Sequence, residues 1–335
     1  MQTPFEQANG TQWTSRDDGN TFLDQIASTT STQLVTLGES VQGRPLRAAI
    51  VGASPEVADN VGMIVATQHG NEPAGRDAAY AFIRDLAETT DPALLEYLES
   101  TCWVIIPTVN PDRILSTREN ANYVNINGDY VALSQPESAA VMGAIQEYEP
   151  VVLIDSHEGG VTFTEDLTSA IPNSNAVIPQ IVALSGQARD AVADAITGKG
   201  GTYDHYSGST SGAVLRNAGA ANHAVTVLLE SYQNPTNDIT APARDFELRV
   251  SDQLDAYYAI MWHHHANRSA YRTASDLSRW PMGPPSKGSS AGSVPFFKMW
   301  QTPAVFFEDS PIIDAYINVN GKQVRVIDQL PNIFE

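Results

Sequence analysis

Residues 63–87 read MIVATQHGNEPAGRDAAYAFIRDLA, which predicts a strand, a short turn and a helix. Met63–Thr67 is apolar and β-branched, as in a buried strand, whereas Ala74–Ala87 has the apolar spacing of a helix. Comparable pairs recur along the chain, and strands that alternate with helices typically build a largely parallel sheet. We therefore expect an α/β fold.

The same patterns predict the remaining elements of this fold. Further strands are expected at Gln33–Thr36, Leu46–Val51, Cys102–Pro107, Val151–Asp155 and Val225–Leu229. Further helices are expected at Gly19–Ala27, Pro136–Tyr148, Val177–Ile196 and Ala243–His265.

The length of 335 residues fits one large α/β domain with a small appendage. We assign residues 1–268 to the main domain, because the composition changes from Ser269 onward. There the stretch WPMGPPSKGSSAGSVP is rich in Pro, Gly and Ser, and short strands are expected at Tyr316–Val319 and Val324–Ile327. Residues 269–335 are therefore expected to form a C-terminal extension packed on the main domain.

The composition indicates a globular protein and excludes some partners. Hydrophobic residues make up 42% and charged residues 17%, and 19 basic against 39 acidic residues give a net charge of -20. This charge opposes binding to nucleic acid and to anionic membranes. Neither a membrane-length apolar run nor a signal peptide is visible, so the protein is cytosolic or has lost a leader. The single cysteine, Cys102, lies in the run CWVIIP and is expected to be a buried strand residue.

Metal-binding and carboxylate side chains follow three predicted strands. His69 and Glu72 follow the first, His157 follows VVLID, and Glu230 follows VTVLL. Sites in α/β sheets lie outside the carboxyl ends of the strands. Two histidines and a glutamate form a zinc ligand set whose fourth position is open, as in catalytic sites. Glu230 is placed to take a proton from an activated water.

Ordinary polar residues also end strands, and a lone His-x-x-Glu pair is common on surface loops. The recurrence at three strand ends favours a metal site over that interpretation. By contrast, the run His263–His265 ends a predicted helix, where the three side chains point to different faces and cannot bind one ion together. Glu158 is expected to point away from its neighbour His157 on an extended chain.

An ordered set of motifs resembles the zinc carboxypeptidase family. The motifs are HGNEPAG (His69–Gly75), NPD (Asn110–Asp112), TRENANYVNIN (Thr117–Asn127), DSHEG (Asp155–Gly159) and VTVLLES (Val225–Ser231), preceded by GESVQGRPLRAAIVG (Gly38–Gly52). The resemblance covers about residues 15–265. It implies a twisted, mixed, largely parallel sheet of about eight strands between helices, a peptide or amide substrate and one zinc ion per chain. We expect a monomer.

The resemblance also implies roles for individual residues. His69, Glu72 and His157 would bind the zinc, Glu230 would be the general base, Arg118 would polarise the scissile carbonyl, and Asn127 would help to hold a substrate carboxylate. Tyr203 and Tyr206, on the loop GKGGTYDHYSGSTSG, are candidates for the mobile tyrosine of the family. We take Tyr206 as the substrate-binding residue, with simple packing as the alternative for either tyrosine.

The chain departs from the family pattern at two positions of one motif. Asn125 stands where the family has an aspartate that bonds the first histidine ligand, so that bond would lose its charge. Gly128 stands where the family has an arginine that binds a C-terminal carboxylate, so carboxypeptidase specificity is expected to weaken. Arg216 and Arg113 are possible substitutes, although a lone arginine is commonly a solvated surface group.

These observations predict a zinc metallopeptidase that hydrolyses peptide bonds, at the C-terminus of its substrate if it follows the family. One alternative is an amidohydrolase acting on a cell-wall peptide or an acylated amino acid, for which Gly128 leaves room. Another is a catalytically silent member that binds a ligand, against which the intact Glu230 argues. The resemblance favours a secreted or periplasmic location.

Overall fold

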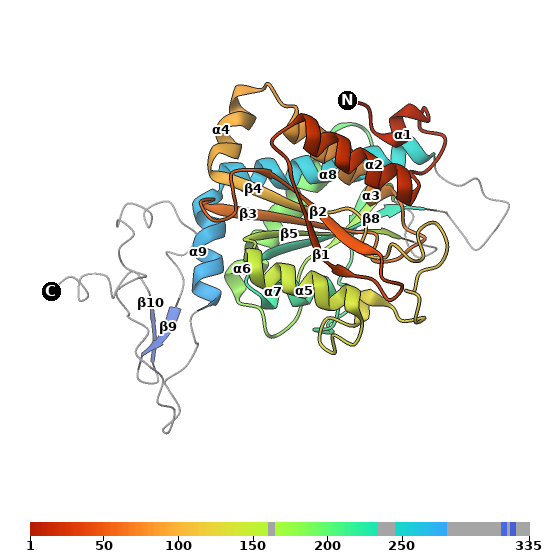
Figure 1. Cartoon of the computed structure of the whole chain (residues 1–335). Coiled ribbons are helices and arrows are strands. Elements are labelled where there is room, and N and C mark those ends of the chain that lie inside the picture. The colour runs from red at the N-terminus through yellow and green to blue at the C-terminus, as the bar shows by residue number, and fades with distance from the viewer. Residues whose placement is uncertain (160–164, 234–244, 280–315, 320–321, 326–335) are drawn as a thin grey trace. The chain divides into compact units, whose positions relative to one another are not determined.

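The computed structural model describes residues 1–159, 165–233, 245–279, 316–319 and 322–325 (Figure 1). The chain divides into two compact units, residues 1–275 and 276–335. The boundary expected after residue 268 and the packing of the extension stay predictions. The second unit contains β9 (Tyr316–Val319) paired antiparallel with β10 (Lys322–Arg325), so the strand expected at Val324 begins two residues earlier. The stretch rich in Pro, Gly and Ser that begins at residue 280 lies outside the described residues.

The first unit contains the expected mixed sheet of eight strands, in the order β1-β2-β4-β3-β5-β8-β6-β7. The strands are β1 (Gln33–Glu39), β2 (Pro45–Gly52), β3 (Asn60–Ala66), β4 (Thr101–Ile106), β5 (Val152–Gly159), β6 (Leu167–Ala170), β7 (Tyr203–His205) and β8 (Val225–Tyr232). Strands β4, β3, β5 and β8 run parallel at the centre. Strands β5 and β8 continue beyond the predicted ends at Asp155 and Leu229, so His157 and Glu230 lie inside the strands.

The helices of the first unit agree with the sequence patterns where the patterns are long. They are α1 (Pro4–Gln7), α2 (Arg16–Thr29), α3 (Ala74–Ala87), α4 (Pro92–Ser100), the short 3₁₀ helix η1 (Ile126–Gly128), α5 (Pro136–Tyr148), α6 (Pro179–Gly198), α7 (Leu215–Ala221) and α8 (Phe246–Ala266). Helices α3 and α5 have the predicted bounds. Helix α4 was not expected, although Asp91 and Pro92 form a typical helix start.

A further helix, α9 (Arg268–Ser278), occupies the beginning of the expected extension. Within this helix, Tyr271 and Ala274 are buried in the main core. The first residues that were assigned to the extension form a helix with an apolar face.

Helices cover both faces of the sheet (Figure 1). One apolar cluster packs α2, α3, α6 and α8 against the face that carries Ile64, and a second packs α5 and α7 against the face that carries Met63 and Val65. Alternate strand residues point to opposite faces, so the two clusters lie on opposite sides of the sheet. The central strands are consequently buried on both faces, and Cys102 is a buried residue of β4 as expected.

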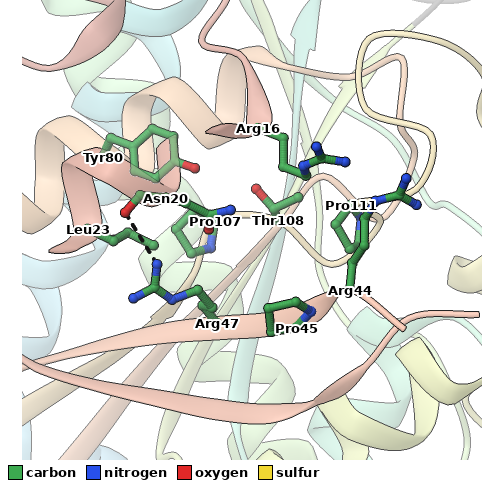
Figure 2. A pocket seen from close by; sticks show the side chains of 10 residues that line it. All are labelled: Arg16, Asn20, Leu23, Arg44, Pro45, Arg47, Tyr80, Pro107, Thr108 and Pro111. Carbon is green, nitrogen blue, oxygen red and sulfur yellow. Dashed lines mark hydrogen bonds between the residues drawn. The ribbon is translucent and has the colours of Figure 1, made fainter. Parts of the chain in front are cut away.

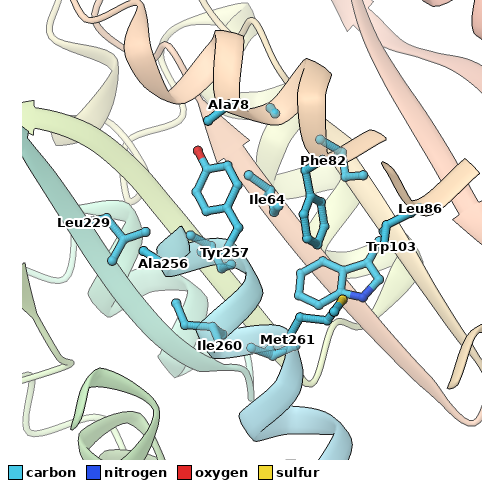
Figure 3. Close-up of a cluster of buried hydrophobic side chains, with 14 of the residues drawn as sticks. Ile64, Ala78, Phe82, Leu86, Trp103, Leu229, Ala256, Tyr257, Ile260 and Met261 are labelled. Carbon is cyan, nitrogen blue, oxygen red and sulfur yellow. The ribbon is translucent and has the colours of Figure 1, made fainter. Parts of the chain in front are cut away.

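Aromatic side chains join α3 and α8 over the centre of the sheet (Figure 3). The ring of Phe82 meets Trp103 edge-on at 5.4 Å between centroids and Tyr257 at 5.9 Å. The hydroxyl of Tyr257 then donates to Ser156 Oγ at 2.6 Å, and Ser156 directly precedes His157 on β5. The rigid core thus reaches the residue next to a candidate metal ligand.

Candidate metal centre and active site

The candidate residues meet at the carboxyl edge of three neighbouring parallel strands. Strand β3 ends at Ala66, next to Ser156 of β5, and His69 follows three residues later. His157 of β5 lies directly beside Glu230 of β8 in the sheet register. The predicted convergence of the strand ends is therefore present in the fold.

His69, Glu72 and His157 form a buried cluster that could hold a metal ion. The Nδ1 atom of His69 lies 2.8 Å from Glu72 Oε1, and the Nδ1 atom of His157 lies 2.8 Å from Glu72 Oε2. The two Nδ1 atoms lie 3.1 Å apart. Among the residues that the structure describes, no other group of three such side chains is close enough to hold a metal ion.

The geometry of this cluster fits zinc. Ligands at about 2.0–2.1 Å in tetrahedral geometry are separated from one another by about 3.3 Å, close to the observed separations. Two ring nitrogens and a carboxylate turned toward one point are also the donor types that zinc accepts. The Nε2 atoms face the oxygens of Asp155 and Asn125, which favours ring protons there and leaves two Nδ1 acceptors that a cation between them would bind.

The outer nitrogens of the two histidines have different partners. The Nε2 atom of His157 lies 2.9 Å from Asp155 Oδ1, whereas the Nε2 atom of His69 lies 2.9 Å from Asn125 Oδ1. A carboxylate behind a histidine raises its basicity as a ligand, and an amide does so less. The expected bond of Asn125 to the first histidine is present, and it is uncharged.

Two backbone constraints fix the path of the loop between β3 and α3. Thr67 has φ +52°, which is uncommon for a β-branched residue and turns the chain where it leaves the strand. A side chain at Gly70 would place its Cβ 2.1 Å from the carbonyl oxygen of Arg113, so only glycine fits there. The loop that carries His69 and Glu72 is therefore tightly constrained.

Glu158 fixes the start of α3 rather than pointing to the metal cluster. Helix α3 has no side-chain cap of its own, and Glu158 Oε2 instead accepts from the backbone N–H of Ala74 at 2.8 Å. Its other oxygen accepts from Arg249 of α8. This buried pair ties together β5, α3 and α8 directly behind the cluster.

Burial and charge set the protonation of the cluster. Burial alone would raise the pKa of Glu72, but the neighbouring His69 and His157 lower it. Burial alone would lower the pKa of His157, but Asp155 and Glu72 raise it well above its ordinary value. The pKa of His69 is lowered by burial. The cluster therefore holds an ionised carboxylate, as a metal ligand must be.

Glu230 lies beside this cluster and is half-buried. Burial raises its pKa to about 8, with Glu72 and Asp155 acting in the same direction and His157 in the opposite one. The hydroxyl of Tyr206 lies 3.4 Å from Glu230 Oε1. Tyr203, the other candidate tyrosine, instead contacts Ser169 at the far edge of the sheet. Of the two tyrosines, the fold brings Tyr206 to Glu230.

Arg118 and Asn127 also lie at the cluster. Arg118 Nη1 donates to Glu72 Oε1 at 3.0 Å, and its side chain is about half exposed. The amide nitrogen of Asn127 lies 2.9 Å from His157 Nε2, and its oxygen accepts from the backbone N–H of Leu215 at 2.7 Å. Both residues therefore contact candidate metal ligands directly.

The two arginines considered as substitutes differ in position. Gly128 is exposed, and the nearest atom to an added Cβ would be 4.0 Å away, so a side chain at this position would begin in open space. Arg113 stacks over the exposed ring of Tyr123 at 5.2 Å. Arg216 is only 1% exposed, which contradicts its interpretation as a solvated surface group.

The residues that form hydrogen bonds to the outer side of His157 were not predicted from the sequence. Gln68 donates to Asp155 Oδ1 at 2.6 Å, and Tyr130 donates to Gln68 Oε1 at 2.6 Å. Asp155 could have been found, because it precedes His157 by two residues and so shares its side of the strand. The partners Gln68 and Tyr130 carry no comparable signal in the sequence.

A separate pocket lies between α2, α3 and the segment after β4 (Figure 2). Its lining includes Arg16, Arg44 and Arg47, but none of the candidate site residues. Each of these arginines already pairs with an acidic residue, respectively Asp17, Asp112 and Asp24. The pocket is therefore distinct from the metal cluster and carries little unbalanced charge.

Comparison with known proteins places this geometry in context. Residues 20–122 match the zinc carboxypeptidase family. Mouse carboxypeptidase M is 30% identical over 165 residues, which cover 42% of this chain and 37% of that protein. The metallo-carboxypeptidase from Burkholderia cenocepacia has a TM-score of 0.61 at 19% identity, over 75% of this chain and 69% of its own. The Pseudomonas aeruginosa metallo-carboxypeptidase gives 0.63 at 16% identity, over 77% and 70%.

The match in sequence and the likeness in fold confirm the resemblance that the motifs indicated. The stretch aligned with carboxypeptidase M spans little more than a third of that protein. Within the described residues, no helix combines the length and the apolar character needed to cross a bilayer.

Proposed function

Because this chain resembles the zinc carboxypeptidases in the sequence of residues 20–122 and in fold, we propose that it is a zinc-dependent hydrolase of peptide or related amide bonds. The convergence of His69, Glu72 and His157 beside Glu230 carries this proposal. When bound, zinc acts as a Lewis acid that makes water a nucleophile at neutral pH. A single zinc ion held by these three side chains leaves one position open for that chemistry.

Glu230 is proposed as the general base. It would take a proton from the attacking water and return it to the leaving amine. Burial raises its pKa to about 8 in the protein without a cation. A divalent ion beside a carboxylate lowers its pKa, which would leave Glu230 ionised and ready to accept a proton at neutral pH.

Arg118 and Tyr206 are proposed to act on the substrate. The half-exposed guanidinium of Arg118 lies within bonding distance of Glu72, so it can reach an oxyanion that forms next to the metal. Tyr206 can bond a substrate group when its hydroxyl leaves Glu230. Asn127, which lies in η1 beside His157, is proposed to contact the same substrate.

The test is the substitution Glu230→Gln in the zinc-loaded protein. The amide is nearly isosteric and is not a metal ligand, so zinc content and unfolding temperature should stay unchanged. Turnover of the best substrate should fall by about 100-fold or more, the scale of general acid-base catalysis. The control is Glu99→Gln, because Glu99 is exposed on α4 and far along the chain from the site. Near wild-type turnover in Glu230→Gln would show that another group is the base.

A substrate panel separates the alternatives. It should contain peptides with free C-termini, acylated amino acids and cell-wall peptides. Cleavage restricted to the last two classes would replace the peptidase assignment with an amidohydrolase, for which the space at Gly128 leaves room. A protein that binds zinc but cleaves nothing in the panel would be a silent member.

A further inference from the structure

Arg216 is a buried cation beside the candidate active site. It lies in the first turn of α7 and is 1% exposed. The preceding residue, Leu215, donates its backbone N–H to Asn127, and Arg216 donates its own backbone N–H to Asp155 Oδ2 at 3.1 Å. Two bonds therefore fix the start of α7 to residues that contact His157.

The guanidinium of Arg216 is held by neutral groups. Its Nη2 donates to the carbonyl oxygen of Ser209 at 2.6 Å and to Asn173 Oδ1 at 3.3 Å. A Cβ at Gly208 would come within 2.1 Å of Nη1, so the loop wraps closely around the cation. Among the described residues no carboxylate forms a salt bridge with Arg216, and its buried Nε has no hydrogen-bond partner.

An incompletely paired buried cation is costly. Groups with strongly perturbed charge environments cluster at functional sites, which makes Arg216 a candidate for binding. Burial lowers the pKa of Arg216, while Tyr206, Asp155 and Glu230 act to raise it, so all three lie near the guanidinium. Tyr206 bonds the guanidinium and also reaches Glu230. The cation therefore lies behind the one tyrosine that the fold brings to the general base.

We propose that Arg216 binds a carboxylate of the substrate, which takes the place of the Tyr206 hydroxyl at the guanidinium. This inference rests on the proposed hydrolase function, because it names the substrates that this site would prefer. The substrate class is a peptide or acylated amino acid with a carboxylate close to the cleaved amide bond. Arg216 then replaces the arginine that is absent at Gly128. The protein should therefore prefer substrates with a carboxylate, although Gly128 alone predicts only a weak preference.

Arg113 is a weaker candidate for this role. Its guanidinium stacks over Tyr123, whose side chain is 78% exposed, and it has no contact with Tyr206 or Glu230 among the described residues. It therefore supplies a matched control, since it is an arginine of the same domain on a different loop.

The first measurement is binding, because it does not depend on turnover. Calorimetry on the zinc-loaded chain compares N-acetyl amino acids with their amides across a set of side chains. A charge-assisted hydrogen bond contributes about 1.5–3 kcal/mol, which corresponds to about 10- to 150-fold tighter binding of the acid. Equal affinities of the wild-type protein for acid and amide would overturn the proposal without any variant.

The second measurement assigns the preference to Arg216. In Arg216→Gln the acid should lose its advantage over the amide, Arg216→Lys should keep part of it, and Arg113→Gln should keep all of it. Zinc content and unfolding temperature identify variants that fold. If Arg216→Gln does not fold, Arg216→Lys decides instead. A ratio of acid to amide affinity equal to that of the wild type would overturn the assignment. A reduced ratio supports it.

Hydrolysis then distinguishes the two possible sources of the carboxylate. Peptides with a free C-terminus and neutral side chains are compared with amidated peptides that carry Asp or Glu next to the cleaved bond. Faster cleavage of the first set identifies a terminal carboxylate, and faster cleavage of the second identifies an acidic side chain. If both sets are cleaved no faster than neutral amidated peptides, the proposed role of Arg216 is refuted and the proposed hydrolase is not. No cleavage of any peptide or acylated amino acid refutes the proposed hydrolase, while the ratio of acid to amide affinity still tests Arg216.

Discussion

The substitution Asn125→Asp should tighten zinc binding. Asn125 Oδ1 lies 2.9 Å from His69 Nε2, on the side of the ring opposite to the metal cluster. A carboxylate at that position would form a charge-assisted bond and make His69 a stronger donor, as Asp155 does for His157. Outer partners of this kind change metal affinity by about 10- to 100-fold.

The structure makes this substitution a sharp test. Asn125 is exposed and precedes η1 without a side-chain cap, so aspartate fits there without loss of an existing bond. The dissociation constant is measured by competition with a chelator of known affinity at constant pH and ionic strength. A gain of about 10- to 100-fold corresponds to about 1.4–2.8 kcal/mol of binding free energy.

The control for this experiment is Asn122→Asp, which adds the same charge three residues away. Asn122 is exposed and bonds Gln135 rather than His69, so its effect on zinc affinity should be small. An unchanged dissociation constant in Asn125→Asp would refute the argument from the outer partner. Equal gains in both variants would show that only long-range charge matters.

Two further outcomes are expected. His69→Ala should remove bound zinc, as measured by elemental analysis of protein supplied with zinc, whereas His205→Ala, at an exposed position of β7, should retain it. The second outcome concerns His264, whose pKa burial lowers to about 3, with Arg268 and neighbouring histidines acting in the same direction. The unfolded chain binds this proton near pH 6.5, so stability should fall as the pH drops below 6.5, by about 2 kcal/mol between pH 7 and 5. Denaturant unfolding of His264→Phe should show a pH dependence smaller by this amount, and an equal dependence would contradict the assignment.

The buried position of His264 indicates a structural role for this residue of the run His263–His265. Trp103 Nε1 donates to the hydroxyl of Tyr97 at 3.1 Å, and that hydroxyl lies 2.8 Å from His264 Nδ1. A neutral ring can accept from the Tyr97 hydroxyl through Nδ1, which agrees with the lowered pKa of His264. The histidines of this run have separate partners, since His263 bonds Tyr271 whereas His264 bonds Tyr97.

Much of the fold follows from local sequence patterns. The unit formed by β3, the loop and α3 is visible because a β-branched apolar run and a helical repeat are properties of neighbouring residues. Strand ends are less certain, since β5 and β8 continue past their apolar runs. Polar residues such as His157 stay in the strand because pairing with β8 and contacts with the cluster stabilise them there.

The sequence by itself indicated that His69, Glu72, His157 and Glu230 gather at the carboxyl edge of the central strands, because neighbouring parallel strands share that edge. Only the tertiary structure decided which atoms bond the outer nitrogens of the histidine ligands, which tyrosine reaches Glu230, and that Arg216 is buried. Those contacts join residues that are far apart in the chain, and they depend on the sheet register and on the paths of irregular loops. No local periodicity encodes such paths, so a lone arginine reads as a surface group until the loop around it is placed.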